Sequence, residues 1–527
     1  MEGPFQPALL EIPPQPEIPA AAEPEQPSPG RKIKAIDRSQ SFWRAVIVEE
    51  LVPANHKARA IWDLTGQLDL NRFLSRIRSH EGAAGRAAWD PRLLLSVWLY
   101  AYSEQVSSAR EIERLMEYEP GLMWLAGLGL VNYHTLSSFR SANGEEFKKL
   151  LTELLGLLSQ QGLVDLKLVA HDGTKVRAQA GADSFRREGT LAKEIATAQQ
   201  MVEEIEQSEA EQEQGKLSRR EAAQKRIAQE RLKRMQEAAQ QLEEIRATAE
   251  SEQEWAEARV SLTEPEARRM KHGDNAIAPS YNVQLSTDAA HKIVVGVHLT
   301  QCSSDSGSLL PAMEEVKARV QQFPEQVVAD GGFTNHKSIA QMKENEIEFY
   351  GSLPQPEVRQ AAAMKAAGID PAFSPAAFVI VQPKKSLQCP AGKTLTYVRG
   401  SKKRGSEYQQ YRAEGNDCSQ CEFRKQCCPN NASKGRTVSV RITEEGDVVE
   451  FREKMKREES KAIYRKRGAV AEFPHCWIKE KLGLRKFRLR GLAKAGAEAL
   501  CAVLTYNVMQ WMRLSWLPQR PVEASTA

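Results

Sequence analysis

The chain has 527 residues, a formal net charge of +4, and charged side chains at 27% of its positions. This length exceeds what one ordinary hydrophobic core requires and predicts roughly two to four domains. The nearly balanced charge gives no sign of a polyanion-binding surface over the whole chain, so any such surface has to be local. Eight cysteines in a chain this long exclude a secreted disulfide framework.

The start of the chain is rich in Pro, Glu and Ala. It has neither the basic start and apolar segment of a signal peptide nor an apolar stretch long enough to span a membrane. We therefore expect a disordered, Pro-rich tail over residues 1–38, a short second tail over residues 516–527, and a cytoplasmic location.

Residues 39–163 carry apolar side chains at helical spacing, as in Pro91–Leu99, and predict an all-helical N-terminal domain. Within this region, a helix starting near Ser108 and another over His134–Arg140 are joined by a segment containing glycine. This order is typical of a helix-turn-helix, which places its second helix in a DNA groove. We therefore predict DNA binding by this domain, with Arg140 as a contact. A plain helical bundle has the same pattern, so both interpretations stay open.

Residues 184–257 consist mostly of Ala, Glu, Gln, Lys and Arg, with apolar residues at alternating spacings of three and four. This pattern predicts a coiled-coil seam from Leu191 to Ile205 and a second seam from Ile227 to Ile245. Gly215 and a capping pattern at Ser218–Glu221 separate the two. We expect an antiparallel helical hairpin that serves either as a spacer or in dimerisation.

An α/β core is predicted on both sides of this hairpin, over residues 164–352 and 451–515. Its strands and helices are indicated by apolar runs and periodic segments at 168–172, 281–286, 292–298, 306–322, 327–330, 335–345 and 347–351. With the hairpin set aside as an insertion, the order is three strands, helix, strand, helix, strand and a later helix. That order matches the ribonuclease H-like fold, a mixed five-stranded sheet flanked by helices.

Asp172, Asp330 and Glu472 are the candidate catalytic residues. Asp172 and Asp330 each end an apolar run and precede glycine, and Glu472 lies on a basic helix. In a ribonuclease H-like core the first carboxylate lies on the first strand, the second follows the fourth strand, and the third is on the final helix. Taken singly, an Asp before Gly is usually only a turn former. Jointly, the three acids predict a metal site.

Phosphodiester cleavage gives these acids a role. Two divalent ions about 3.5–4 Å apart activate the attacking oxygen and neutralise the leaving oxygen. Mg²⁺ prefers a few carboxylate oxygens and keeps several waters. We therefore expect Asp172, Asp330 and Glu472 to hold two Mg²⁺ or Mn²⁺ ions.

The segment Phe451–Lys494 contains fifteen Lys or Arg residues against five acids. This local excess predicts a phosphate-binding face, and a solvated surface helix is the alternative. The run that contains Arg485, Lys486, Arg488 and Arg490 is predicted to follow a DNA backbone without reading its sequence.

The chain resembles the DDE transposases of bacterial insertion sequences, in the branch with a Tyr-Arg-Glu-Lys signature. Tyr464, Arg467, Glu472 and Lys479 occupy the signature positions, with one more residue between Arg467 and Glu472 than in the commonest form. Glu459 and Glu480 are therefore alternatives for the third acid. The resemblance spans about residues 40 to 512 and includes the segments 172–175, 281–284, 330–333 and 487–491.

This resemblance implies a transposase that binds terminal inverted repeats, hydrolyses phosphodiester bonds and joins the freed 3′-hydroxyl to target DNA. It implies that Tyr464, Arg467 and Lys479 hold the backbone of double-stranded DNA. Because two element ends have to be held together, a homodimer is expected. We expect it to act at the bacterial nucleoid. The alternatives are an inactive DNA-binding relic and a metal-dependent nuclease without strand transfer.

Residues 353–450 are predicted to form a β-rich insertion that contains most of the cysteines. Cys389, the pair Cys418-x2-Cys421, and Cys427 have a spacing that predicts a structural Zn²⁺ site. A redox-sensitive or iron-sulfur site and plain reduced thiols are the alternatives. Isolated, buried thiols are expected at Cys302, Cys476 and Cys501.

Overall fold

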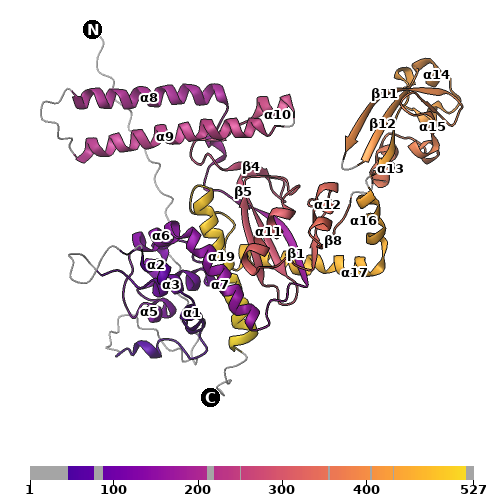
Figure 1. Ribbon diagram of the computed structural model, residues 1–527. Helices are drawn as coiled ribbons and strands as arrows, with labels where there is room; N and C mark the ends of the chain where they lie inside the picture. The colour runs from indigo at the N-terminus through magenta and orange to yellow at the C-terminus, as the bar shows by residue number, and fades with distance from the viewer. Residues whose placement is uncertain are drawn as a thin grey trace, which may run out of the picture. The chain divides into compact units, whose positions relative to one another are not determined.

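The computed structural model describes residues 45–517, except residues 76, 78–86, 211–218, 250, 354–355, 404–405, 431 and 445. The predicted N-terminal tail, the break at Gly215 and most of the predicted C-terminal tail lie outside the described residues. All elements below belong to one contact unit, Val48–Ala527. Figure 1 labels most of them.

The N-terminal region is helical, as predicted. Asp90 begins one helix by accepting the N–H of Arg92, with Pro91 at the first helical position. Asn132 begins another in the same way by accepting the N–H of His134. The helices are α1 (Lys57–Thr65), α2 (Asn71–Leu74), α3 (Pro91–Ser103), α4 (Ala109–Leu115), α5 (Pro120–Leu125), α6 (Tyr133–Ala142) and α7 (Gly144–Gln160).

The predicted helix-turn-helix does not form in the expected way. Helix α5 lies between α4 and α6, whereas a helix-turn-helix joins its two helices by a turn of about three to four residues. The glycines that indicated one connection instead belong to the turn after α5, where Gly127 has a φ of +57°. The helical-bundle interpretation therefore describes this region better.

A mixed sheet follows, formed by β1 (Leu168–Arg177), β4 (Arg268–Lys271), β5 (Ile277–Asp288), β6 (Val294–Thr300), β7 (Gln326–Ala329) and β8 (Glu348–Tyr350). The order is β4-β5-β1-β7-β8, and β6 also pairs with β5. Strand β1 pairs antiparallel with β5 and parallel with β7, which pairs parallel with β8. The sheet has one strand more than predicted, because the long β5 pairs with β4 along its first half and with β6 along its second.

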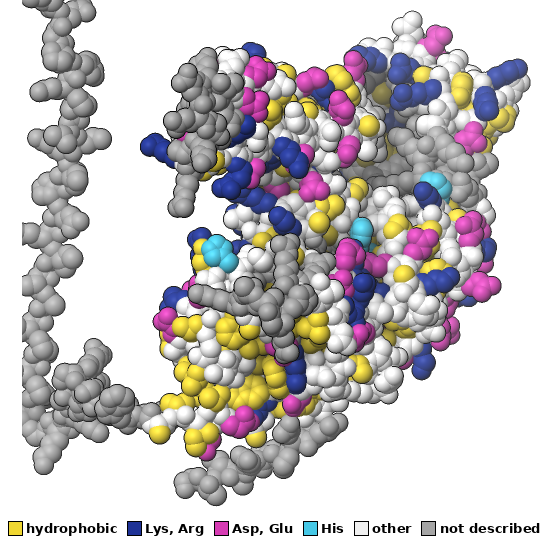
Figure 2. Space-filling model, turned by 60° about the vertical axis from the view of Figure 1, so that its left-hand side comes forward, with side chains coloured by type: hydrophobic (Ala, Val, Ile, Leu, Met, Phe, Trp, Pro, Cys, Tyr) yellow, Lys and Arg dark blue, Asp and Glu magenta, His cyan; other side chains and the backbone are white. Residues whose placement is uncertain are grey.

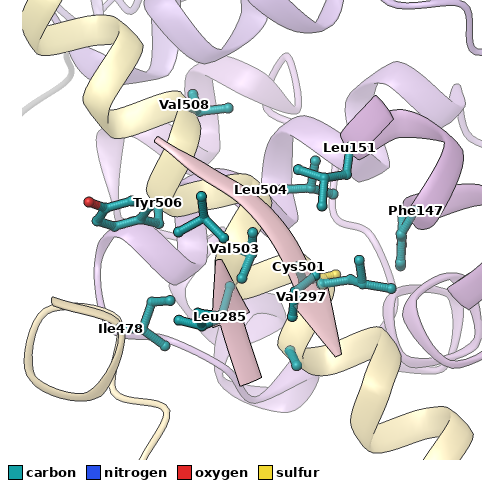
Figure 3. Packing of buried hydrophobic residues seen from close by; sticks show 14 of the residues in the cluster. Phe147, Leu151, Leu285, Val297, Ile478, Cys501, Val503, Leu504, Tyr506 and Val508 are labelled. Carbon is teal, nitrogen blue, oxygen red and sulfur yellow. The ribbon is translucent and has the colours of Figure 1, made fainter. Parts of the chain in front are cut away.

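Helices complete the core around this sheet: α11 (Leu309–Val320), α12 (His336–Glu344), α16 (Gly446–Lys456), α17 (Glu458–Arg467), α18 (Phe473–Glu480) and α19 (Leu492–Trp511). Helix α19 is buried along most of its length and packs on α7, α3 and β6. Figure 3 shows Val503 and Leu504 of α19 among side chains from β5, β6 and α7. Asn507 both accepts from Val294 N–H and donates to its carbonyl, at 2.9 and 2.8 Å, which ties α19 to β6. No described helix is long and apolar enough to cross a membrane.

The predicted helical hairpin consists of α8 (Glu188–Ala210) and α9 (Arg219–Ala247), which run side by side (Figure 1) and are followed by α10 (Glu252–Glu257). Ion pairs from Arg246 to Glu188 and from Lys225 to Glu206 show that the two helices are antiparallel. The seam differs in part from the prediction, since Ile227 is 62% exposed. Two short strands, β2 (Phe185–Arg186) and β3 (Val260–Ser261), pair where the hairpin leaves the core.

The β-rich insertion is a five-stranded antiparallel sheet in the order β13-β12-β11-β10-β9. Three short helices belong to the same part of the chain. The elements are α13 (Pro356–Ala366), β9 (Val379–Gln382), β10 (Ser386–Gln388), β11 (Thr394–Lys403), β12 (Ser406–Ala413), α14 (Gly415–Ser419), α15 (Arg424–Cys427) and β13 (Thr437–Glu444).

Arg140 is an interior residue, so the prediction that it contacts DNA is wrong. Its side chain is 3% exposed, donates to the Tyr102 hydroxyl and the Ser107 carbonyl, and lies over the Trp98 ring. The buried carboxylate of Glu498 is 3.9 Å away and also accepts two backbone N–H groups. The helix-turn-helix interpretation placed Arg140 on a helix that enters a DNA groove, but this helix, α6, packs on α19.

Replacing Arg140 tests this buried pair. Arg140→Ala leaves Glu498 uncompensated in the interior, and we expect a loss of about 3–5 kcal/mol in the free energy of unfolding. Thermal and urea unfolding measure this loss. The exposed pair of Arg114 and Glu111 supplies the control, because Arg114→Ala should leave the unfolding midpoint unchanged. Equal midpoints for the two variants would contradict the account.

Candidate active site

Two of the predicted acids meet where a parallel strand pair ends. Strands β1 and β7 pair in register up to His171 and Ala329, so Asp172 and Asp330 occupy the next position on each strand. Neighbouring strands lie about 4.7–4.9 Å apart, so this register places the two residues side by side. Asp172 was expected at a strand end, but β1 continues to Arg177 through its pairing with β5.

Local backbone groups support both carboxylates. Asp172 accepts the N–H of Gly173 at 2.8 Å, and Asp330 accepts the N–H of Gly332 at 2.7 Å. Burial raises the pKa of Asp172 to about 6, and the charge of Asp330 adds to the rise. The Gly173 N–H and the guanidinium of Arg467 act in the opposite direction. Crowding of like charges is the pattern expected where a cation is held.

Arg467 joins the third acid to this pair. Its guanidinium nitrogens lie 3.6 Å from a carboxylate oxygen of Asp172 and 3.6 Å from one of Glu472. Glu472 has a side chain that is 66% exposed, so its contact with Arg467 is loosely held. Arg467 thus links Asp172 to Glu472, while Asp330 lies next to Asp172 on the neighbouring strand.

A π-helical turn explains the extra residue in the signature. Gly468–Glu472 forms this turn between α17 and α18. An α-helix turns about 100° per residue, so five residues would place Arg467 and Glu472 on different faces. The wider turn, with its bond to the fifth residue, keeps them on one side, and such turns are frequent at functional sites.

Helix α18 is fixed to β1 by two residues four apart, His475 and Lys479. The buried His475 ring donates from Nε2 to the Asp172 carbonyl at 3.2 Å, and Lys479 donates to the Thr174 hydroxyl. Burial lowers the pKa of His475 to about 3, so its ring is neutral. Burial also lowers the pKa of Lys479. Lys479 therefore lies inside the site, next to Asp172, rather than on an open surface.

The remaining predicted DNA contacts are accessible. Arg485, Lys486, Arg488 and Arg490 are exposed on a segment whose backbone pairs with Arg177. This stretch is held to the end of β1 by its buried Phe487. Across the face drawn in Figure 2, Lys and Arg side chains lie among Asp and Glu side chains.

Tyr464 is half-buried. It packs against the cluster around Ala170 and Val328, and lines a cleft of about 850 Å³. Several cations of α16 and α17, including Arg452 and Lys461, line the same cleft. Both the packing role and a contact to DNA are compatible with this placement.

A polar chain behind β1 was missed from the sequence. Ser286 bonds His171, His171 bonds Gln284, and Gln284 donates to Asp305 at 2.8 Å. Asn282 donates to the same Asp305 oxygen. Asp305 contributes to the raised pKa of Asp172. No sequence signal marks it, because its partners lie 21 and 23 positions away on β5.

The donor chemistry of the site fits a hard divalent cation. Its oxygens come from carboxylates, and Arg467 already supplies positive charge between two of them. Among the described residues, however, no group of three or more His, Cys, Asp or Glu side chains is preformed as a metal site.

The cysteines of the β-rich insertion also converge. Cys389, Cys418, Cys421 and Cys427 line one cavity, and Cys428 lines it with them. The expectation of isolated, buried thiols is correct for Cys501 but wrong for Cys302 and Cys476, which are exposed.

Two protein families match parts of the chain. A family described as a transposase DDE domain matches residues 388–512, which include Glu472 and the cysteines of the cavity. A family described as a transposase domain (DUF772) matches residues 46–142 in the N-terminal helical region. No curated protein matches the chain. Asp172 and Asp330 lie between the two matched segments, so their assignment depends on the geometry above. The two matches indicate that the chain is an insertion-sequence DDE transposase.

Proposed function

We propose that the protein cleaves DNA at the ends of its insertion sequence and joins the freed 3′-hydroxyl to a target, using Asp172, Asp330 and Glu472. The observation that carries this proposal is the placement of the three acids. They are far apart in the sequence, yet Asp330 lies beside Asp172, and Arg467 contacts both Asp172 and Glu472.

The topology supports a ribonuclease H-like core. Once the hairpin and the short strands β2, β3 and β4 are set aside, the strands β1, β5, β6, β7 and β8 follow one another in the chain, and β1 lies in the middle of the sheet order. Asp172 is on the first of these strands, Asp330 follows the fourth, and Glu472 lies between two later helices. The two aspartates occupy the positions expected for that fold, whereas Glu472 ends the turn before α18 rather than lying on the final helix, α19.

In this proposal Asp172, Asp330 and Glu472 hold Mg²⁺ or Mn²⁺. When bound, the ions activate the attacking oxygen and stabilise the leaving oxygen. Arg467 balances the carboxylate charge while DNA is absent and turns to a phosphate when DNA binds, because a guanidinium matches phosphate oxygens well. Lys479 lies near the same phosphate, and the neutral His475 keeps Asp172 in position.

Double-stranded DNA is the partner that the exposed cations favour. Tyr464 and the run from Arg485 to Arg490 hold the backbone in a salt-sensitive, sequence-independent way. Two element ends have to be held at once, and we propose a homodimer that acts at the bacterial nucleoid. The presence of all three carboxylates favours catalysis over an inactive DNA-binding relic, since acids placed near phosphate weaken binding. A nuclease without strand transfer is distinguished by assay.

The three acids should each be required for DNA cleavage. With Mg²⁺, the full-length protein should cut a DNA fragment that carries the gene's own flanks and join the ends to a target. Asp172→Asn, Asp330→Asn and Glu472→Gln should each reduce cleavage by more than about a hundredfold, because each removes a metal ligand. Gel assays with labelled DNA measure both steps.

The alternative acids supply matched controls. Glu459 lies at the start of α17, and Glu480 pairs with Arg485, so neither reaches Asp172. Glu459→Gln and Glu480→Gln should therefore cleave at close to the normal rate. Activity that survives Glu472→Gln but not one of these changes would move the third ligand. Cleavage without joining would favour the nuclease.

The pKa of Asp172 predicts how metal affinity depends on pH. Only the ionised carboxylate binds metal, so affinity should be full above pH 7 and fall as the pH drops through about 6. We expect about tenfold weaker Mn²⁺ binding at pH 5 than at pH 7. Asp305→Asn removes a neighbouring negative charge and should shift this profile to lower pH. Calorimetric titration measures the profile, and a flat one would contradict the account.

Arg467 should compete with metal when DNA is absent. At pH 8, where Asp172 is ionised, Arg467→Ala should tighten Mn²⁺ binding on the order of three- to tenfold, because a competing positive charge is removed. The same variant should cleave DNA more slowly, because a phosphate contact is lost. Arg465→Ala is the control, since Arg465 lies on the same helix but pairs with Glu458. Weaker Mn²⁺ binding by Arg467→Ala would contradict this role.

A further inference from the structure

The thiols of the β-rich insertion gather around one small cavity. Cys389 comes from the turn between β10 and β11, while Cys418 and Cys421 come from α14 and the loop after it. Cys427 ends α15. The cavity between them has a volume of about 30 Å³, close to that of one water-sized sphere. Segments separated by about thirty residues therefore contribute cysteines to the lining of one cavity.

Backbone N–H groups are directed at two of these sulfurs. The Lys393 N–H donates to Cys389 Sγ at 3.3 Å, and the Arg436 N–H donates to Cys418 Sγ at 3.3 Å. The first contact depends on a tight turn in which Gly392 has a φ of +76°, a value that favours glycine. Such donors stabilise thiolate over thiol, and the thiolate is the form that binds metal.

The apolar core of this sheet is small. It contains six buried side chains, and Cys389, Cys418 and Cys427 pack against its edge. Small cores of this kind commonly need a disulfide or a metal for stability. All eight cysteines are free thiols, so no disulfide serves this purpose.

We propose that Cys389, Cys418, Cys421 and Cys427 bind one zinc ion that stabilises the β-rich insertion, at a site separate from the catalytic carboxylates. Four sulfur ligands suit Zn²⁺, which prefers closed tetrahedral sites in structural roles. No described group of side chains is already arranged as a metal site. The thiols therefore close on the ion by rotating about their Cα–Cβ bonds.

Cys428 supplies the matched control. It lines the same cavity but is buried and comes directly after Cys427, the last residue of α15, whereas the four proposed ligands are partly exposed. Cys428→Ser should therefore keep the metal, whereas Cys389→Ser and Cys418→Ser should lose it. Exposed Cys302 gives a second control at a distant position in the chain.

The test is the zinc content of the full-length protein, purified without chelator and measured by plasma mass spectrometry. We expect about one zinc per chain in the wild type and in Cys428→Ser, and less than about one tenth of that in Cys389→Ser and Cys418→Ser. Full zinc content in the last two variants would overturn the assignment. A wild type without zinc, and without thiolate bands on Co²⁺ addition, would overturn the proposal itself.

A second measurement tests the zinc site even if the cysteine variants fail to fold. Wild-type protein titrated with Co²⁺ should develop the visible bands of a tetrahedral thiolate site, and added Zn²⁺ should abolish them. Carboxylate variants such as Asp172→Asn should show the same bands. Because this readout involves no DNA, its outcome is independent of the proposed transposase activity.

Discussion

The parallel pairing of β1 with β7 is the constraint on which the candidate active site depends. It ends at His171 and Ala329, and so places two aspartates next to each other at the edge of a buried region. Two carboxylates at this separation repel each other, which contributes to the raised pKa of Asp172. The backbone N–H groups of Gly173 and Gly332 and the guanidinium of Arg467 offset this repulsion. Arg467 belongs to a helix more than a hundred residues later in the chain.

The helices that follow the β-rich insertion serve this arrangement. The π-helical turn brings Arg467 and Glu472 to one side, and α18 is held to β1 by His475 and Lys479. Helix α19 then anchors these elements, since it packs on β6 through Asn507 and on the N-terminal helices through Glu498 and Arg140. The buried pair of Arg140 and Glu498 adds specificity to this mostly apolar packing.

Much of the fold and part of the site could be predicted from the sequence. Asp172 and Asp330 could be identified because the apolar run and the Asp-Gly pair that ends it are local sequence features. That the two residues lie side by side could not be predicted, since this depends on the register of two strands far apart in the sequence. Glu472 needed the family resemblance, as one extra residue disguises its relation to Arg467 until the π-helical turn is seen. The DNA contact predicted for Arg140 was wrong because the helix-turn-helix pattern does not reveal that this side chain is buried beside Glu498. Asp305 and His475 were missed because their partners lie far away in the chain.

The central claim is that Asp172, Asp330 and Glu472 surround one metal site. The most direct test replaces Mg²⁺ by Fe²⁺ and generates hydroxyl radicals with ascorbate and peroxide, which cut the backbone near the bound metal. The account predicts cuts in three segments, near residues 172, 330 and 472, which excess Mg²⁺ suppresses and Asp172→Asn abolishes together. Cuts that omit any one of the three segments, or that persist unchanged in Asp172→Asn, would contradict it.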